Sequence, residues 1–205
     1  MNIMTKIITV AHQKGGVGKS TLAMNLALCF QEQLSVALVD IDLQGSLYYS
    51  KENLSNLTVI STDQINDLER LAYDLIIVDT PPYLTNRLPE IFGVSDFILI
   101  PTKAGFFDVM AIRSTLSLIY DAQQKFPHIK AGIVRNMIKP RSGITREVSD
   151  LLDTLGTPLL KTMIHDRVSI ARSSITGGVL VGNDEKAKQE ITALAEEVVG
   201  LLTAE

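Results

Sequence analysis

The sequence of 205 residues predicts an α/β fold in which a mostly parallel central sheet of about seven or eight strands carries helices on both faces. Two observations predict this fold. Short apolar segments alternate along the chain with longer amphipathic segments, the order that produces parallel strands joined by crossover helices. The apolar segments also lack strict alternation of polar and apolar residues, as expected of strands that are covered on both faces.

The predicted strands are rich in Ile, Val and Leu. In chain order they are Lys6–Ala11, Val36–Asp40, Thr58–Ile60, Leu75–Asp79, Phe97–Pro101, Ala131–Asn136 and Leu160–Ile164. Ligands of such folds bind at the carboxyl ends of the strands. The residues that follow each strand are therefore the candidates for a functional site.

The predicted helices fall between these strands. In chain order they are Ser20–Gln33, Asp63–Ala72, Asn86–Phe92, Asp108–Lys125, Ile144–Leu155, Val168–Ile175 and Asp184–Leu202. Pro81-Pro82 and Pro140 mark loops. No repeat, low-complexity tract or linker divides the chain, so we expect residues 1–205 to form one domain.

The composition indicates a folded protein of a reducing compartment. Hydrophobic residues make up 46% of the chain and charged residues 20%, so disorder is not expected. The one cysteine, Cys29, excludes an intramolecular disulfide framework and a Cys-rich metal site. No segment approaches the roughly twenty apolar residues of a membrane span. The chain also runs directly into its first strand, which leaves no room for a removable signal, so we expect a cytoplasmic protein.

A glycine-rich loop between the first strand and the first helix predicts a phosphate-binding site of the P-loop NTPase fold. The segment reads Lys14-Gly15-Gly16-Val17-Gly18-Lys19-Ser20-Thr21. In such loops backbone N–H groups point at phosphate oxygens, Lys19 reaches the β/γ-phosphates and the Ser20 hydroxyl ligates Mg²⁺. The usual pattern has a glycine at position 13, where this chain has Gln13, and the extra Lys14 makes the loop a variant. A lysine in a loop is often merely solvated; beside this motif we expect it to be functional.

Acidic residues follow two of the predicted strands. Asp40 and Asp42 end the second strand, and Asp79 ends the fourth. A single aspartate at a strand end is often a turn or helix cap. Buried carboxylates are costly without partners, and Lys19 and a metal ion at the neighbouring loop would supply them.

These three motifs resemble those of the ParA/MinD superfamily of deviant Walker A ATPases, and most closely the small ParA-type (ParF-like) plasmid partition proteins. The extra lysine of that family corresponds to Lys14. The family motif D-x-D-P-Q is matched by Asp40-Ile41-Asp42-Leu43-Gln44, with Leu43 in place of the proline. The motif D-x-P-P is matched by Asp79-Thr80-Pro81-Pro82.

The resemblance implies ATP and Mg²⁺ as cofactors and gives each motif residue a role. Lys14 would cross a homodimer interface to the phosphates of the partner's ATP, and Asp42 would position the hydrolytic water. Asp79 would hold Mg²⁺ through water together with Ser20, and Asp40 would support the metal shell. Because an exposed aspartate is a weak base at neutral pH, we expect hydrolysis to be slow.

The adenine pocket is expected at the end of the sixth strand, where the family contacts the base. There Asn136 could hydrogen-bond adenine and Met137 could pack on it; the alternative is an Asn in a turn. The preference for ATP over GTP rests on the resemblance, and no guanine-reading Asn-Lys-x-Asp is present.

Basic residues are concentrated in one segment of an acidic chain. Residues 130–172 hold eight basic and four acidic residues, a net charge of +4, so the remainder of the chain, whose total is −4, carries −8. Such a segment can bind DNA phosphates without reading sequence, or can consist of ordinary solvated side chains. The resemblance favours DNA binding, for which the candidates are Arg141, Arg167, Arg172 and Lys188.

The expected function is therefore that of an ATP-dependent homodimer that binds DNA non-specifically. A centromere-binding, ParB-type adaptor would stimulate hydrolysis, and the cycle would partition plasmid or chromosomal DNA or position another large cargo. The protein would be nucleoid-associated when ATP-bound. Because the chain is short and no DNA-reading region precedes the glycine loop, plasmid or mobile-element partition is the favoured case.

Two alternatives remain on the same scaffold. A MinD-like membrane-positioning ATPase needs a basic amphipathic C-terminal helix, whereas residues 190–205 have an acidic polar face and are expected to pack on the body. A metabolic synthetase would not need Lys14. An iron–sulfur reductase is excluded because the cysteine ligands are missing. His12, next to the loop, could touch a phosphate or the interface, but local packing is expected.

Overall fold

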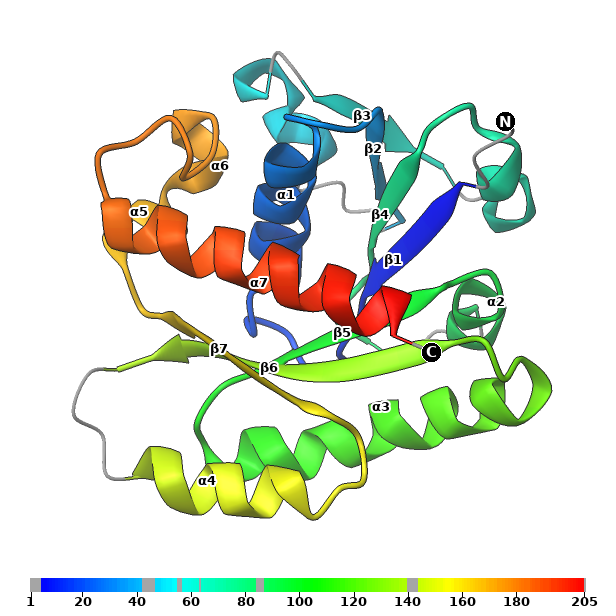
Figure 1. The fold of residues 1–205 in the computed structure, drawn as a ribbon, viewed down its shortest axis with the longest axis vertical. Coiled ribbons are helices and arrows are strands. Elements are labelled where there is room, and N and C mark those ends of the chain that lie inside the picture. The colour runs from blue at the N-terminus through cyan, green and yellow to red at the C-terminus, as the bar shows by residue number, and fades with distance from the viewer. Residues whose placement is uncertain are drawn as a thin grey trace.

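The computed structural model describes residues 5–41, 47–54, 57–62, 64–83, 87–139 and 144–204. Within these residues the strands form one seven-stranded parallel sheet in the order β3-β2-β4-β1-β5-β6-β7 (Figure 1). The strands are β1 Lys6–Val10, β2 Val36–Asp40, β3 Thr58–Ser61, β4 Leu75–Asp79, β5 Phe97–Thr102, β6 Lys130–Ile138 and β7 Leu159–His165. The predicted fold class and all seven predicted strands are confirmed.

The helices also follow the predicted order. They are α1 Lys19–Phe30, α2 Leu88–Gly93, α3 Phe106–Lys125, α4 Ile144–Asp153, α5 Val168–Ala171, α6 Ser173–Thr176 and α7 Glu185–Thr203, with 3-10 helices η1 Tyr48–Asn53 and η2 Ile65–Arg70.

Two local predictions were wrong, each for an identifiable reason, and one element was missed. The segment predicted as helix 63–72 contains the 3-10 helix η2, whose buried Ile65 and Leu68 are three residues apart and so share one side of a three-residue turn. The predicted helix 168–175 is divided at Arg172 into α5 and α6. There the Ser173 hydroxyl donates to the Ile170 carbonyl, a local bond that competes with continuous helix. The helix η1 was not predicted.

The core forms two layers, one on each face of the sheet. Successive strand residues point to opposite faces, so Ile8 and Leu38 pack with α1 and α7, whereas Ile7 and Ile76 pack with α2, α3 and α4. Figure 1 shows α1 and α7 over one face and α3 and α4 over the other. Both faces of the central strands are thus covered, which explains their continuous apolar sequences.

The last helix, α7, packs against the body, as predicted. The residues that it buries form one apolar stripe: Ala187, Ile191, Leu194, Ala195 and Val198. This stripe joins the same apolar cluster as α1. None of the described helices has the length and hydropathy needed to cross a membrane.

The topology brings the predicted motifs together. Strands β2 and β1 both pair with β4, so their carboxyl ends meet at one edge of the sheet. Asp79 is in register with Val10 on one side and with Asp40 on the other. The glycine loop that follows β1 therefore begins beside Asp79, and Asp40 lies one strand further along the sheet.

Candidate functional site

The glycine loop joins β1 to α1 and requires glycine at two positions. Gly16 and Gly18 have φ angles of +70° and +90°, a left-handed conformation that side chains disfavour. At Gly18 a Cβ atom would also lie well under 3.0 Å from the Asn136 amide nitrogen and 3.2 Å from the Met137 methyl carbon. The loop can approach β6 this closely only because Gly18 has no side chain.

Asn136 ties the end of β6 to this loop. Its Nδ2 donates a hydrogen bond of 2.7 Å to the Val17 carbonyl, although the two residues are 119 positions apart. The side chain is buried, and its Oδ1 has no hydrogen-bond partner among the described residues. Met137 follows with φ +55°, which is uncommon outside glycine. The backbone of β6 is thus shaped to meet the glycine loop.

The two lysines of the loop occupy different environments. Lys19, the first residue of α1, is buried, and its Nζ lies 3.5 Å from the Lys14 carbonyl oxygen across the loop. Lys14 extends to the outside, where its ammonium pairs with Asp108 in the first turn of α3. One lysine is therefore part of the loop interior, and the other lies on its outer side.

His12 supports the loop from beneath. It is 2% exposed, and its Nδ1 accepts a hydrogen bond of 2.8 Å from the Lys14 backbone N–H. Burial, and next the nearby charge of Lys19, lower the pKa of His12 to about 4. The ring is therefore neutral at pH 7 with its proton on Nε2, and it packs locally as the sequence led us to expect.

The carboxylates of Asp40 and Asp79 lie at the ends of β2 and β4, and both residues are fully buried. Asp40 Oδ2 accepts a hydrogen bond of 3.2 Å from the Leu47 N–H. The next residue after Asp79, Thr80, donates its hydroxyl to the Val10 carbonyl at 2.9 Å and fixes β4 to the start of the loop. Asp42 lies outside the described residues.

Magnesium suits this arrangement better than a metal held by protein alone. Within the described part of the chain, no group of three or more His, Cys, Asp or Glu residues could hold a metal ion. Mg²⁺ characteristically uses one or two carboxylates, with water and substrate phosphates completing its shell. Buried Asp40 and Asp79, with Ser20 at the loop, fit that donor set.

Comparison with known proteins decides the family. Residues 8–181 match the model of the CobQ/CobB/MinD/ParA nucleotide-binding domain. The chain belongs to this family. Its glycine loop, the aspartates at the ends of β2 and β4 and the end of β6 all lie within the matched residues.

Curated members of this family cover nearly the whole chain. Maintenance of carboxysome distribution protein A from Halothiobacillus neapolitanus is 31% identical in an alignment of 207 positions. The alignment covers 94% of this chain and 95% of that protein. The sporulation initiation inhibitor protein Soj of Bacillus subtilis is 23% identical, with 95% and 98% covered. Protein IncC of Escherichia coli is 24% identical, with 96% of this chain and 70% of IncC covered.

Solved structures show the same fold. Apo McdA of Cyanothece superposes with a TM-score of 0.75 at 19% identity, covering 97% of this chain and 99% of the other. A plasmid partition protein from Borrelia burgdorferi bound to AMPPNP gives a TM-score of 0.73 at 22% identity, with 96% and 99% covered. Cobyrinic acid a,c-diamide synthase from Mycobacterium smegmatis gives 0.78 at 22% identity, with 98% and 96% covered.

Two of the residues predicted to bind DNA are ion-paired in the described structure. Arg167 donates to Glu190 Oε1 at 2.8 Å, and this hydrogen bond raises the pKa of Arg167. Lys188 pairs with Glu185 at 2.8 Å. Arg172 is exposed, and Arg141 lies outside the described residues. Two of the three described candidates therefore have their charge compensated by acidic residues of α7.

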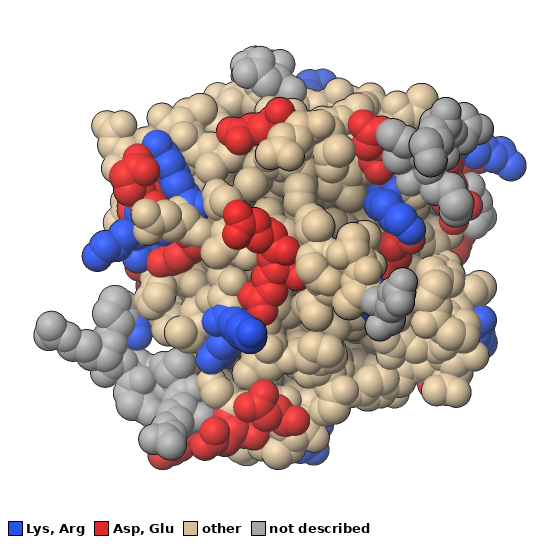
Figure 2. All heavy atoms as spheres, viewed as in Figure 1, with Lys and Arg blue, Asp and Glu red and all other residues tan. Residues whose placement is uncertain are grey.

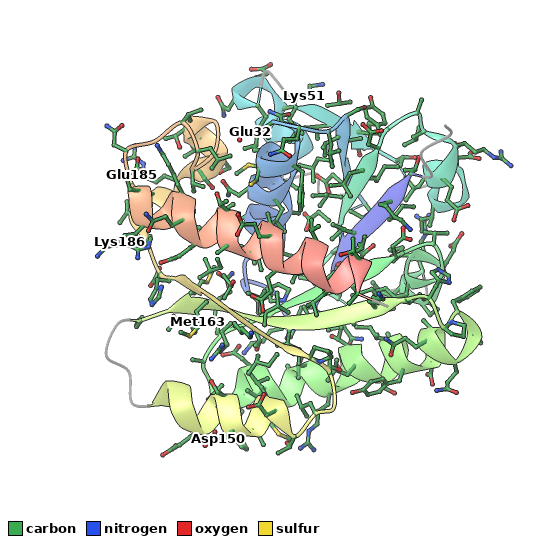
Figure 3. All side chains as sticks on the ribbon, viewed as in Figure 1. Glu32, Lys51, Asp150, Met163, Glu185 and Lys186 are labelled. Carbon is green, nitrogen blue, oxygen red and sulfur yellow. The ribbon has the colours of Figure 1, made fainter. Side chains whose placement is uncertain are left out.

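The surface over α7 has the same mixed character. Figure 2 shows Lys and Arg side chains beside Asp and Glu side chains on the face that carries this helix. Figure 3 shows Glu185 and Lys186 close together at the start of α7. Charge counting along the segment predicted a net excess of cations, but folding places acidic residues of α7 next to them.

Three features near the loop and α7 were not predicted from the sequence. Asp108, which holds Lys14, is 94 residues away from it, and no motif links the two. Glu190 accepts hydrogen bonds from Arg167 and from the His165 N–H, and so joins α7 to the end of β7. Lys103 Nζ lies 3.9 Å from the position of a Cβ atom on Gly16. The positions of Asp108 and Lys103 beside the loop depend on β5 lying next to β1 in the sheet.

Proposed function

We propose that this protein is a Mg²⁺-dependent ATPase that dimerises when it binds ATP, binds DNA non-specifically as a dimer and positions a large cargo. The observation that carries the proposal is the separation of the two loop lysines. Lys19 is buried against the loop and serves the nucleotide of its own copy. Lys14 points outward to Asp108, where it can reach the nucleotide of a second copy.

To catalyse ATP hydrolysis, these residues would position the phosphates and the attacking water and neutralise negative charge on the phosphates. The loop N–H groups and Lys19 hold the phosphates, while Ser20, Asp79 and Asp40 provide the magnesium side of the site. Asp42 positions the attacking water, and Lys14 of the second copy adds positive charge, in the manner of an arginine finger. Bound Mg²⁺ supplies charge stabilisation of the transferred phosphoryl group. Support comes from the Borrelia protein, bound to AMPPNP, and from the Mycobacterium synthase, bound to an ATP analogue and magnesium.

Asn136 and Met137 are proposed to contact adenine. They line a small cavity of about 40 Å³ with Thr21, Asp166 and Ile170, next to the amino end of α1. The buried Asn136 Oδ1 can accept a hydrogen bond from the adenine amino group, while its Nδ2 stays on Val17. A guanine carbonyl at that position would face an acceptor, so this contact favours ATP over GTP.

The cargo is proposed to be a large assembly recruited through an adaptor protein. The carboxysome distribution protein shares 31% identity with this chain, compared with 24% for the plasmid protein IncC. This difference favours a protein compartment as cargo, with plasmid DNA as the second candidate. The adaptor would stimulate hydrolysis, and the ATP-bound dimer would reside on the nucleoid. Of the described basic candidates, Arg172 contributes most to DNA binding because Arg167 and Lys188 are ion-paired.

The test is binding to a non-specific DNA duplex with ATP, ADP or no nucleotide. The expected result is ATP-dependent binding that weakens steeply as salt is raised and that Lys14→Ala abolishes. Lys51→Ala is the control, since it removes a positive charge in η1. The absence of DNA binding in every nucleotide state would overturn the proposal and direct attention to lipid surfaces or small substrates.

A further inference from the structure

A third lysine lies beside the glycine loop, outside the motif that defines the loop. Lys103 is the first residue after β5, and its Nζ lies 3.9 Å from the position of a Cβ atom on Gly16. The side chain is partly buried. Apart from the residues next to Gly16 in the chain, no other atom of the described residues lies within 4 Å of that position. The space beside Gly16 is therefore bordered by an ammonium group and open to a ligand.

The order of strands places Lys103 at the level of the loop. Strand β1 is in register with β5 as far as Val10 and Leu99, and the Ala11 N–H still donates to the Leu99 carbonyl at 3.0 Å. Strand β5 then continues to Thr102 in register with β6, while the chain after β1 has turned into the loop. The backbone that carries Lys103 is thus held by the sheet, as the backbone that carries Asp79 is.

The charge of Lys103 is not compensated in the way that the charge of Lys14 is. The Lys14 ammonium pairs with Asp108, whereas Lys103 forms no ion pair with any of the described residues. A cation that is partly removed from water gains free energy when an anion comes to lie beside it. Lys103 is therefore a cation that is available to an anion bound at the loop.

The two halves of the loop face different neighbours. Gly18 lies against the end of β6, where adenine is proposed to bind. Gly15 lies instead beside the segment that follows β4, because Pro82 Cβ is 3.5 Å from the position of a Cβ atom on Gly15. Gly16, next to Gly15, belongs to the half of the loop that lies away from the proposed adenine site and towards the proposed magnesium side.

We propose that Lys103 binds the γ-phosphate of the ATP held by its own copy, and so makes this site selective for a nucleoside triphosphate over a diphosphate. The inference rests on the proposed function. In ATP the γ-phosphate is the group farthest from the base, and bound Mg²⁺ bridges the β- and γ-phosphates. The anion that reaches the half of the loop beside Lys103 is therefore the terminal phosphate.

The charges of a single copy explain why a third lysine is needed. Asp40 and Asp79 are buried carboxylates, and Asp108 offsets Lys14, so Lys19 is the loop lysine left to face the phosphates. A triphosphate brings more negative charge to this site than a diphosphate does. Lys103 supplies the additional positive charge within one copy. A lysine that merely lay in solvent would attract both nucleotides weakly and about equally.

The experiment measures the affinities for Mg²⁺-AMPPNP and for Mg²⁺-ADP by isothermal titration calorimetry. The variant is Lys103→Met, which removes the charge but keeps an unbranched apolar side chain, and Lys103→Arg restores the charge. The matched control is Lys125→Met, since Lys125 is exposed at the last residue of α3. Thermal unfolding without nucleotide shows that each variant is folded. Each titration is repeated in a Lys14→Ala background, in which the lysine proposed to act across a dimer is absent.

The expected result for Lys103→Met is binding of AMPPNP that is weaker by at least about tenfold, with binding of ADP weaker by less than about threefold. Lys103→Arg should recover most of the loss, Lys125→Met should bind like wild type, and the Lys14→Ala background should show the same loss.

Three outcomes would contradict the inference. If Lys103→Met binds both nucleotides like wild type, or loses affinity for both equally, the inference is overturned and the proposed function stands. If the loss disappears in the Lys14→Ala background, Lys103 does not act within its own copy and the inference is again wrong. A wild-type protein that binds neither nucleotide would overturn the inference and the proposed function together.

Discussion

Replacing Gly18 by alanine tests the geometry of the glycine loop directly. Gly18 has φ +90°, and its Cβ position lies well under 3.0 Å from Asn136 Nδ2. Alanine would have to adopt a left-handed conformation and displace a side chain that is buried and hydrogen-bonded to Val17. Both effects act on the folded state, so we expect the free energy of unfolding to fall.

The magnitude follows from two contributions. A left-handed conformation costs an alanine about 1–2 kcal/mol. Breaking the bond from Asn136 to the Val17 carbonyl leaves buried polar groups without partners, at about 1–3 kcal/mol. Reduced freedom of the unfolded chain returns about 0.4–1 kcal/mol. The expected net destabilisation of Gly18→Ala is therefore about 1–4.6 kcal/mol.

Chemical denaturation measures this change in the free energy of unfolding. Making the same substitution in the Asn136→Ala variant separates the two contributions. In Asn136→Ala the obstructing amide is absent, so Gly18→Ala should then cost only about 1 kcal/mol. Gly200→Ala is the matched control, because a Cβ there meets nothing within 4 Å and lies in α7, where alanine should stabilise by about 0.5–1 kcal/mol. An equal cost of Gly18→Ala in both backgrounds would refute the argument that Asn136 fixes the loop.

Two further predictions concern titratable groups, one buried and one partly buried. His12→Leu should lower the free energy of unfolding by about 1–3 kcal/mol because the partly buried Lys14 N–H loses its acceptor, whereas His12→Asn should retain most of the wild-type stability. Burial, and next the charge of Lys19, lower the pKa of His12 to about 4, so as pH falls the unfolded state binds the proton before the folded state does. The free energy of unfolding of wild type should therefore decrease from about pH 6.5 down to about pH 4. In a denaturation series, His12→Asn should lack this pH dependence. Glu190→Gln should cost about 1–3 kcal/mol at pH 7, where it weakens the charged bond to Arg167. Burial raises the pKa of Glu190, but hydrogen bonding to Arg167 and His165 outweighs it, so the pKa of Glu190 is lowered. The stability difference between wild type and Glu190→Gln should therefore disappear as pH falls below about 4.3 in the same denaturation series. A constant difference down to about pH 3 would contradict this prediction.

The sheet was predictable because its strands are buried on both faces. Continuous Ile, Val and Leu runs such as Leu75–Asp79 have no other stable location in a chain of this size, and the ends of these runs identified the aspartates. The loop was predictable for a related reason, since only glycine tolerates the backbone conformation at Gly16 and Gly18. In both cases the determining interaction is local to a few consecutive residues.

The contacts that complete the site could not be predicted, because they join residues that are distant in the chain. Lys14 with Asp108 and Val17 with Asn136 are separated by 94 and 119 residues. Their proximity depends on β1 lying next to β5 and on β5 pairing with β6, an order that periodicity does not specify. The loop motif thus identified Lys14 as a candidate residue, but it could not identify Asp108, the carboxylate that pairs with it.

The net charge of residues 130–172 is a second case in which residues distant in the chain change what the local sequence predicts. A net excess of +4 over residues 130–172 is a property of the sequence, yet α7 lies beyond that segment and brings Glu190 against Arg167. The other paired candidate, Lys188, lies within α7 and pairs there with Glu185. To bind a phosphate, Arg167 would have to give up the sheltered carboxylate of Glu190 at 2.8 Å, whereas the exposed pair of Lys188 with Glu185 is weak. Under the proposed function we therefore expect DNA affinity to come from exposed cations such as Arg172, presented twice by a dimer. Single-copy binding to DNA should then be too weak to detect, and nucleotide-driven dimerisation would be the step that turns DNA binding on.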